Sequence, residues 1–213
     1  MSKKRGFVIF VILAPIIVAG LLWWLSTPNS AWTTAKEAYS IAVAYALAGE
    51  PDARLKSVEL IGYWSDSEEL QGKTDKWTLD FCAPDQTYIT LEVHEETVFL
   101  PDPWNIQADK KEPSELWEEA RAEGWTTNDT SPGGEWVDSV DVFRDALARA
   151  QGEIQEDIEL YEMKLYSYSS TEGPENVWIV IFCEKGTPAR AISYTYDGED
   201  GSYIEQEEFW LVG

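Results

Sequence analysis

The chain has 213 residues, and 39 acidic against 16 basic side chains give it a formal net charge of −23. Phosphate groups are bound by clustered Lys and Arg, so this charge argues against nucleic acid and anionic lipid headgroups as partners. With 11 Trp, 10 Tyr and 7 Phe, the chain is too aromatic to be disordered. The acidic surface keeps an exported domain soluble and is suited to attract divalent cations or basic partners.

The N-terminal segment has the length and the flanks of a membrane anchor. Residues 7–25 carry no charge and are nearly all apolar, which comes close to the roughly 20 residues that a helix needs to cross a bilayer. Three basic residues precede the segment and two tryptophans end it: Lys3, Lys4, Arg5, Trp23 and Trp24. This pattern places the N-terminus in the cytoplasm and the rest of the chain outside. A cleaved signal peptide is the alternative, but its apolar region is typically about 7 to 15 residues, and no small-x-small cleavage site follows. We therefore expect residues 1–30 to form a cytoplasmic N-terminus and the transmembrane helix of a single-pass cell-membrane protein.

A six-residue segment occurs twice in the chain. Residues 77–82 and 178–183 have Trp, Phe and Cys in the same places, 101 positions apart. Self-similarity of this kind indicates two copies of one structural unit. We predict an α+β fold in which the transmembrane helix is followed by two repeated helix-plus-antiparallel-sheet modules. The modules are expected at residues 31–100 and 136–213, with a connector that contains a short helix at 101–135.

The first module begins with a helix. Thr34 and Glu37 have the spacing of a capping box, and alanines then recur on one helical face until Gly49 and Pro51 end the run. Alternating apolar residues predict three strands, at 57–64, 77–82 and 89–94.

The connector and the second module follow the same rules. Pro113 suits the first turn of the connector helix and Gly124 its end, while Asp138 is placed to cap the helix of the second module. In residues 178–183 both faces of the predicted strand are apolar, which requires a cover on the second face. The connector helix, the first module and a partner protein are the alternatives for that cover. The final residues 209–212 either add a strand or form an apolar tail.

The chain resembles the PepSY-like modules of exported, membrane-anchored bacterial proteins, which have a cystatin-like arrangement of a helix on an antiparallel sheet. The residues that carry the resemblance are Thr34-Ala35-Lys36-Glu37-Ala38 and Trp77 in the first module, and Trp178 and Tyr196-Asp197-Gly198-Glu199-Asp200-Gly201 in the second. The first module departs from the pattern because residues 93–97 contain no glycine turn. The resemblance implies a non-catalytic accessory role outside the membrane, inhibitory or regulatory toward a peptidase or another envelope protein.

No catalytic pattern is evident. His94 is the only histidine, and the nearest candidate nucleophile, Cys82, would lie roughly 23 Å away along the predicted hairpin, far beyond hydrogen-bond reach. The acidic turn at 197–201 lacks the ligand order of an EF-hand. We therefore predict that the chain is not an enzyme and holds no metal or cofactor.

The two cysteines, Cys82 and Cys183, end the two copies of the repeated segment. A disulfide between them would persist outside the cytoplasm, provided that the two modules pack about an axis near the strand ends. The alternative is that each is a small, buried apolar residue.

Two functions from different classes remain open. The first is a non-catalytic, membrane-tethered extracytoplasmic protein-binding or regulatory module that acts on an envelope protein through its sheet edges and aromatic surfaces. The second is a structural component of a cell-envelope assembly. The N-terminal helix would attach either one to the membrane.

Overall fold

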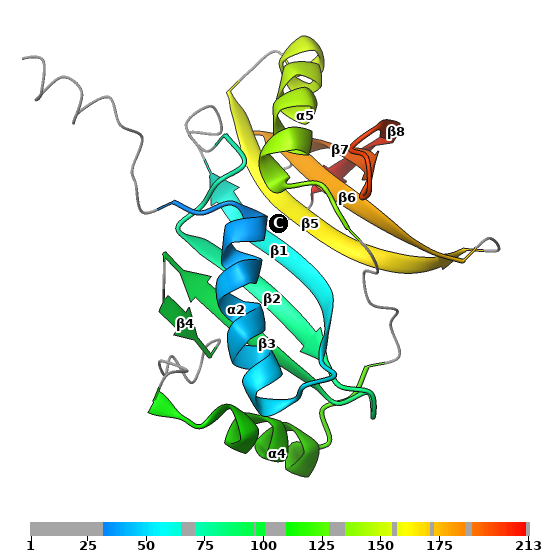
Figure 1. The fold of residues 1–213 in the computed structure, drawn as a ribbon. Coiled ribbons are helices and arrows are strands. Elements are labelled where there is room, and N and C mark those ends of the chain that lie inside the picture. The colour runs from blue at the N-terminus through cyan, green and yellow to red at the C-terminus, as the bar shows by residue number, and fades with distance from the viewer. Residues whose placement is uncertain are drawn as a thin grey trace, which may run out of the picture. The chain divides into compact units, whose positions relative to one another are not determined.

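The computed structural model describes residues 32–64, 71–95, 97–100, 110–127, 135–154, 157–170, 173–185 and 189–211. Residues Trp32–Gly213 form one compact unit, separate from Met1–Ala31. Within this unit, eight antiparallel strands and three helices are described (Figure 1). The helices are α2 (Ala35–Gly49), α4 (Pro113–Glu123) and α5 (Ser139–Glu153). The strands are β1 (Arg54–Trp64), β2 (Lys76–Cys82), β3 (Tyr88–His94), β4 (Thr97–Phe99), β5 (Ile158–Ser170), β6 (Gly173–Glu184), β7 (Ala189–Asp197) and β8 (Tyr203–Leu211).

The predicted fold class, a transmembrane helix followed by two repeated helix-plus-sheet modules, is wrong. All eight strands belong to a single sheet with the order β4-β3-β2-β1-β5-β6-β7-β8. The two halves join because β1 pairs antiparallel with β5, so that Val58 lies opposite Leu165 and Leu60 opposite Met163. This pairing satisfies two strand edges that separate modules would leave exposed.

The described residues contain no helix that is both long enough and apolar enough to cross a membrane. The apolar segment at 7–25, in which the sequence places a transmembrane helix, lies outside the described residues.

Helix α2 begins and packs as its sequence predicts. The Thr34 hydroxyl accepts a hydrogen bond from the Glu37 N–H (3.2 Å), and the Glu37 carboxylate accepts one from the Thr34 N–H (2.8 Å). Four fully buried alanines face the sheet: Ala35, Ala38, Ala42 and Ala46. Because these side chains are small, the helix lies close to the strands.

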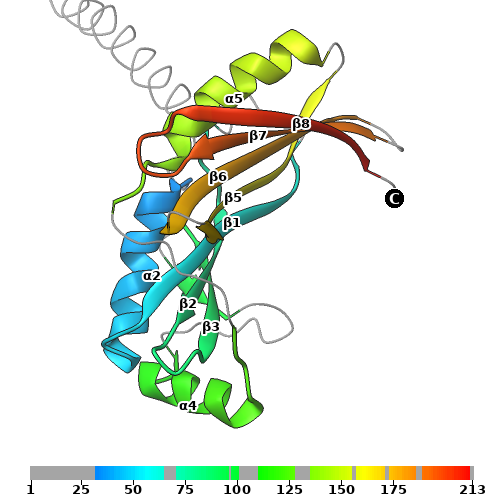
Figure 2. The same cartoon turned by 90° about the vertical axis from the view of Figure 1, so that its right-hand side faces the viewer.

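Helices α2 and α5 cover the same face of the sheet, as the side view shows (Figure 2). Two fully buried tryptophans on this face fix the helix starts. The Trp77 indole donates to the Thr33 carbonyl (2.9 Å) and the Trp178 indole to the Val137 carbonyl (3.0 Å). Each acceptor lies one residue before the N-cap of its helix, so each tryptophan places a helix N-terminus over the sheet.

The N-termini of α2 and α5 meet, and they share capping groups. The Asp138 carboxylate accepts hydrogen bonds from the N–H groups of Ser139 (2.8 Å) and of Lys36 in the other helix (3.0 Å). The buried Ser139 hydroxyl accepts from the Ala35 N–H (3.0 Å) and donates to the Gly72 carbonyl (2.7 Å). Helix N-termini carry partial positive charge, so a shared carboxylate offsets the repulsion between them.

Gly72 allows this junction to close. Its φ is +76°, and a Cβ atom there would lie 2.7 Å from the Val140 Cα. A larger residue would be strained by its backbone conformation and would collide with α5.

We expect Ser139→Ala to lower the free energy of unfolding by about 1 to 3 kcal/mol, because it leaves the Ala35 N–H and the Gly72 carbonyl buried without a partner. Urea denaturation of the full-length chain in detergent measures the change. Ser40→Ala is the control, since the Ser40 hydroxyl bonds the Glu37 carbonyl at an exposed site and should change stability by less than about 0.5 kcal/mol. Equal effects of the two substitutions would contradict a role for Ser139 in joining the halves.

Candidate functional site

Strand β8 is the most prominent unpartnered element of the sheet. It is the last strand in the sheet order, and among the described strands it pairs only with β7. Most of its nine residues are exposed, and the strand runs along the edge of the upper half of the molecule in Figure 2. A strand edge presents free backbone donors and acceptors, which makes this edge a candidate binding surface.

In the acidic turn that leads into β8, the carboxylates of Asp197 and Asp200 accept hydrogen bonds from backbone N–H groups of the turn. The Asp197 carboxylate accepts hydrogen bonds from the N–H groups of Glu199 (2.7 Å) and Asp200 (3.2 Å). The Asp200 carboxylate accepts from the Ser202 N–H (2.8 Å), and Gly201 has a φ of +74°. The carboxylates thus cap the turn's own backbone. No group of three metal-ligating side chains occurs among the described residues.

The hydrogen bonds of this turn also show which N–H and C=O groups of β8 point away from β7. Asp197 donates to the Ser202 carbonyl (2.8 Å) and accepts from Gly201 (3.0 Å), so its backbone faces β8. Hydrogen bonds alternate sides along an antiparallel strand. The next β7 residues that face β8 are therefore Thr195, Ser193 and Ala191, which lie opposite Glu205, Glu207 and Phe209. It follows that the N–H and C=O groups of Gln206, Glu208 and Trp210 point outward from the sheet.

Side-chain contacts with α5 hold β8 in place. Arg190 on β7 forms a bidentate ion pair with Glu208, with both N–O distances 2.9 Å, and also donates to the Glu153 carbonyl (3.1 Å). The Gln206 amide donates to the Glu153 carboxylate (3.0 Å). The ion pair raises the pKa of Arg190 and lowers the pKa of Glu208. The strand is thus fastened to the C-terminal end of the helix.

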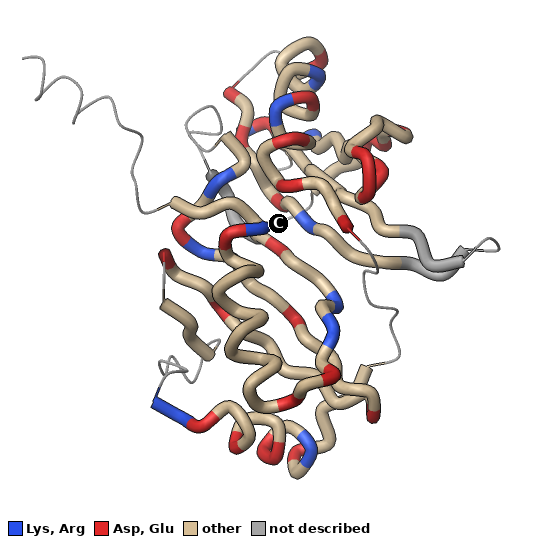
Figure 3. Tube along the Cα trace, viewed as in Figure 1, with Lys and Arg blue, Asp and Glu red and all other residues tan. Residues whose placement is uncertain are grey.

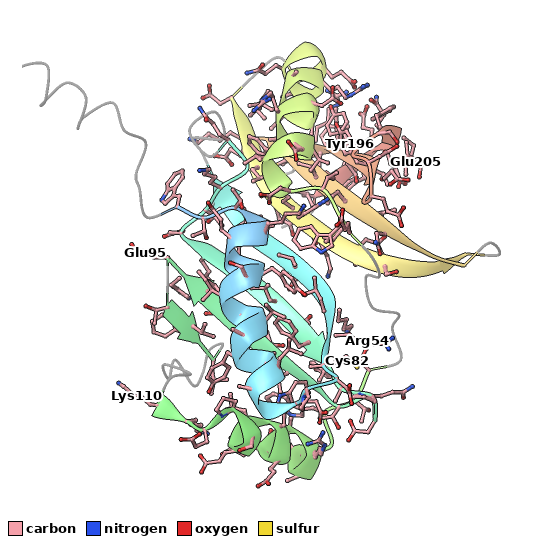
Figure 4. The ribbon with its side chains drawn as sticks, in the orientation of Figure 1. Arg54, Cys82, Glu95, Lys110, Tyr196 and Glu205 are labelled. Atoms are coloured by element: carbon pink, nitrogen blue, oxygen red, sulfur yellow. The ribbon has the colours of Figure 1, made fainter. Side chains whose placement is uncertain are left out.

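Tyr203, the first residue of β8, is held by a cation–π contact between its ring and Arg149. The Arg149 guanidinium lies 3.8 Å from the centre of the Tyr203 ring and donates to Asp145 (2.6 Å). The Tyr196 hydroxyl donates to the same carboxylate (3.0 Å). The bond from Arg149 is the main reason that the pKa of Asp145 is lowered, and burial raises the pKa of Tyr196. Figure 4 shows Tyr196 and Glu205 at this end of the molecule.

The surface of β8 combines exposed apolar groups with free carboxylates. Three of the four large apolar side chains that are exposed among the described residues lie on it: Trp210 (59%), Ile204 (48%) and Tyr203 (36%). Glu205 and Glu207 are exposed, and within the described part of the chain neither forms an ion pair. The acidic residues of this region are red in Figure 3.

The sheet face that points away from the helices carries a small second core beside β8. Its buried members are Ile181, Cys183, Ala189 and Ala191, with Tyr161, Ile179, Phe209 and Leu211 packed against them. The sequence prediction that residues 178–183 are apolar on both faces is confirmed. Within the described residues, the side chains on this second face pack beside those of the neighbouring strands, and the cluster contains no residue of the connector helix.

Cys82 and Cys183 do not come together. Both thiols are free. Cys82 lies opposite Arg54 at the start of β1 (Figure 4), whereas Cys183 lies opposite Glu159. Leu160 is opposite Trp64 at the far end of β1, so the thiols are separated by about ten residues along the strands, or roughly 30 Å at about 3.3 Å per residue. A disulfide needs Cα atoms within about 4.4 to 6.8 Å. The two halves meet at β1 and β5 rather than at the ends of β2 and β6 that hold the cysteines.

His94 is likewise remote from Cys82. His94 is opposite Lys76 and Cys82 is opposite Tyr88, so they occupy opposite ends of the β2–β3 hairpin, roughly 20 Å apart. The His94 Nε2 atom lies 3.0 Å from the Glu92 carboxylate. The hairpin therefore does not form a Cys–His pair.

A groove, separate from the β8 edge, lies between α4 and β3. The groove has a volume of about 470 Å³, counting the space open to solvent. Apolar side chains line most of it: Ile89, Leu100, Leu116, Ala120 and Trp125. Polar side chains complete the lining: Thr90, Lys111, Glu119 and Glu123. Lys111 and Glu119 already pair with each other (2.7 Å).

Comparison with known proteins gives little to add to this geometry. No protein-family model and no curated protein matches the chain. A crystal structure of a "putative lipoprotein" from Clostridium difficile 630 is similar with a TM-score of 0.40 and 11% sequence identity, over 80% of this chain and 92% of that one. The comparisons thus do not support the PepSY-like resemblance.

We expect mass spectrometry without reductant to find two alkylated thiols after unfolding and no disulfide. In the folded chain at pH 8, Cys183 should react more slowly than Cys82, because it is fully buried and burial raises its pKa to about 11. The thiolate is the reactive form, so both factors protect it. If the chain instead has a mass two hydrogens below that of the reduced form and carries no alkyl label, Cys82 and Cys183 are bridged. That result would contradict the strand register described above.

Proposed function

We propose that residues 32–213 form a non-catalytic extracytoplasmic protein-binding module that receives an extended segment of a partner protein along β8. The observation that carries the proposal is the nine-residue edge strand with three exposed apolar side chains and an open backbone edge. Addition of a strand to such an edge draws affinity from main-chain hydrogen bonds and specificity from alternate side chains.

The two edges of the sheet differ in a way that supports this choice. Strand β4 at the opposite edge has only three residues. The start of the neighbouring β3 is covered by residues 125–127, since the Tyr88 N–H donates to the Trp125 carbonyl and Thr87 pairs with Thr126. Natural sheets protect their edges with short strands and covering loops. Strand β8 has nine residues, and no loop among the described residues covers it.

The contacts of β8 with α5 favour binding for an entropic reason. Arg190, Gln206 and Tyr203 already hold the strand in an extended conformation. A partner that pairs with an ordered edge loses less conformational freedom than one that must order both strands.

A component of a cell-envelope assembly is the alternative function, and it would use the same edge between two copies of the chain. An antiparallel pair of β8 strands centred on Gln206 would place Glu205 of each copy opposite Glu207 of the other. Like charges opposite one another destabilise a sheet. The free carboxylates therefore favour a different protein as the partner.

The location is also part of the proposal. The uncharged residues 7–25, preceded by Lys3, Lys4 and Arg5, support a membrane tether with the acidic domain outside the cytoplasm. An envelope protein is then the natural partner, and a regulatory effect on it is the expected consequence of binding.

The test of strand addition places a photo-crosslinking amino acid at Ile204 in the full-length chain, in cells of the source organism. We expect one discrete crosslinked protein that is lost in Glu208→Pro, because proline removes an outward N–H while leaving the backbone hydrogen bonds to β7 in place. Glu208→Ala removes the same side chain but keeps the N–H, so the difference between the two variants isolates the backbone donor.

Gln206→Pro removes a second outward donor and should have the same effect as Glu208→Pro. Near-ultraviolet circular dichroism checks that the proline variants remain folded. Equal crosslinking in the proline and alanine variants would refute strand addition. Ladders of the chain crosslinked to itself would favour the assembly function instead.

The location has its own test. Protease added to intact spheroplasts should cleave the chain beyond Ser30, and the same protease should leave a cytoplasmic control protein intact. Protection of the domain until the membrane is lysed would place it in the cytoplasm and contradict the proposed orientation.

A further inference from the structure

We infer that the segment received by β8 is an antiparallel strand with two basic side chains at alternate positions, preceded by an apolar residue two positions earlier. This inference rests on the proposed function and adds the chemistry of the partner. It comes from the distribution of charged and apolar side chains along the two faces of β8.

Residues that alternate along β8 share a face of the sheet. Glu205, Glu207 and Phe209 lie on the face that points away from the helices, where Phe209 packs on the second core. Gln206 and Glu208 lie on the helix side, where both contact neighbouring residues. Side chains of an added strand would lie beside the β8 residues that they face.

Only the carboxylates on the outer face need a partner. Glu208 is already neutralised by Arg190. Glu205 and Glu207 are opposite Thr195 and Ser193, which are uncharged. Within the described residues no cation pairs with either carboxylate, so Lys or Arg on an added strand would supply the missing charge.

Phe209 determines which kind of residue the partner strand carries opposite it. Its side chain packs against the apolar cluster that contains Cys183 and Ala191. An apolar residue opposite Phe209 would extend that cluster, whereas a charged residue would be desolvated there. In an antiparallel partner, which runs against β8, the order from the N-terminus is apolar, any residue, basic, any residue, basic.

The net charge of the whole chain also favours a basic partner segment. With a formal net charge of −23, the protein attracts basic segments and repels acidic ones, including a second copy of itself. The placement of Glu205 and Glu207 on one face of β8 distinguishes recognition of a specific basic pattern from this general attraction.

The test uses three fluorescein-labelled peptides and fluorescence anisotropy with the full-length chain in detergent. The matching peptide, acetyl-VYVTKTKT-amide, places its lysines opposite Glu207 and Glu205 when its second valine after the acetyl group faces Phe209. The control acetyl-VYVKTTKT-amide has the same composition, but its lysines are three residues apart, so only one of them can lie on the outer face in any register. The third peptide, acetyl-VYVTETET-amide, replaces both lysines with glutamates.

We expect the matching peptide to bind about 1.4- to fivefold more tightly than this control, because it forms one more opposite-charge cross-strand pair. The glutamate peptide should bind more weakly than both. In Glu205→Gln/Glu207→Gln, the preference between the two lysine peptides should disappear, and added salt should reduce it in the unmodified chain.

The outcomes separate this inference from the proposed function. Equal binding of the two lysine peptides, lost in Glu208→Pro, would overturn the charge pattern while leaving strand addition intact. Binding that is equal in Glu208→Pro and Glu208→Ala, or absent for all three peptides, would overturn both. A preference that persists in Glu205→Gln/Glu207→Gln would assign the recognition to other residues and also overturn the inference.

Discussion

β1 and β5 pair antiparallel through Val58, Leu60, Met163 and Leu165, and the other strands take their places outward from this pair. The pairing puts α2 and α5 on one face and brings their N-termini together, where Asp138 caps both. It also sends the short β4 to one edge and the long β8 to the other. The unequal edges are thus a consequence of where the two halves join.

The acidic residues of the molecule have different roles at different depths. Near the sheet they serve as acceptors: Asp80 bonds the hydroxyls of Ser57 (2.8 Å) and Thr90 (2.6 Å), and Glu92 pairs with Lys76 (2.6 Å). Asp138 and Asp197 accept from backbone N–H groups. Glu205 and Glu207 differ because they are exposed, lie on the edge strand and have no ion-pair partner in the part of the chain that the structure describes. Their position on the edge strand, more than the net charge, directs attention to a basic partner.

Local features could be predicted from the sequence, and the joining of the halves could not. The capping box at Thr34, the Pro113 start and Gly124 end of α4, and the inward faces of Trp77 and Trp178 each depend on neighbouring residues and are confirmed. The pairing of β1 with β5 joins residues about a hundred positions apart, and periodicity records which face of a strand is apolar but not which strand lies beside it. Strand β8 was expected only in its last residues, because the run of charged and polar residues before them lacks an apolar alternation. The same missing information explains why the cysteines, equivalent in sequence, lie far apart.

The shared cap has a consequence for the newly made chain. Helix α2 starts at residue 35, but two of the groups that accept hydrogen bonds from its first turn belong to Asp138 and Ser139, about a hundred residues later. At a synthesis rate of about 5 to 20 residues per second, the start of α2 is made roughly 5 to 20 seconds before those acceptors exist. During that interval the edge of β1 that will meet β5 is also open. Co-translational folding of the first half therefore ends with an unfinished helix start and an exposed strand, and only the arrival of the second half completes both.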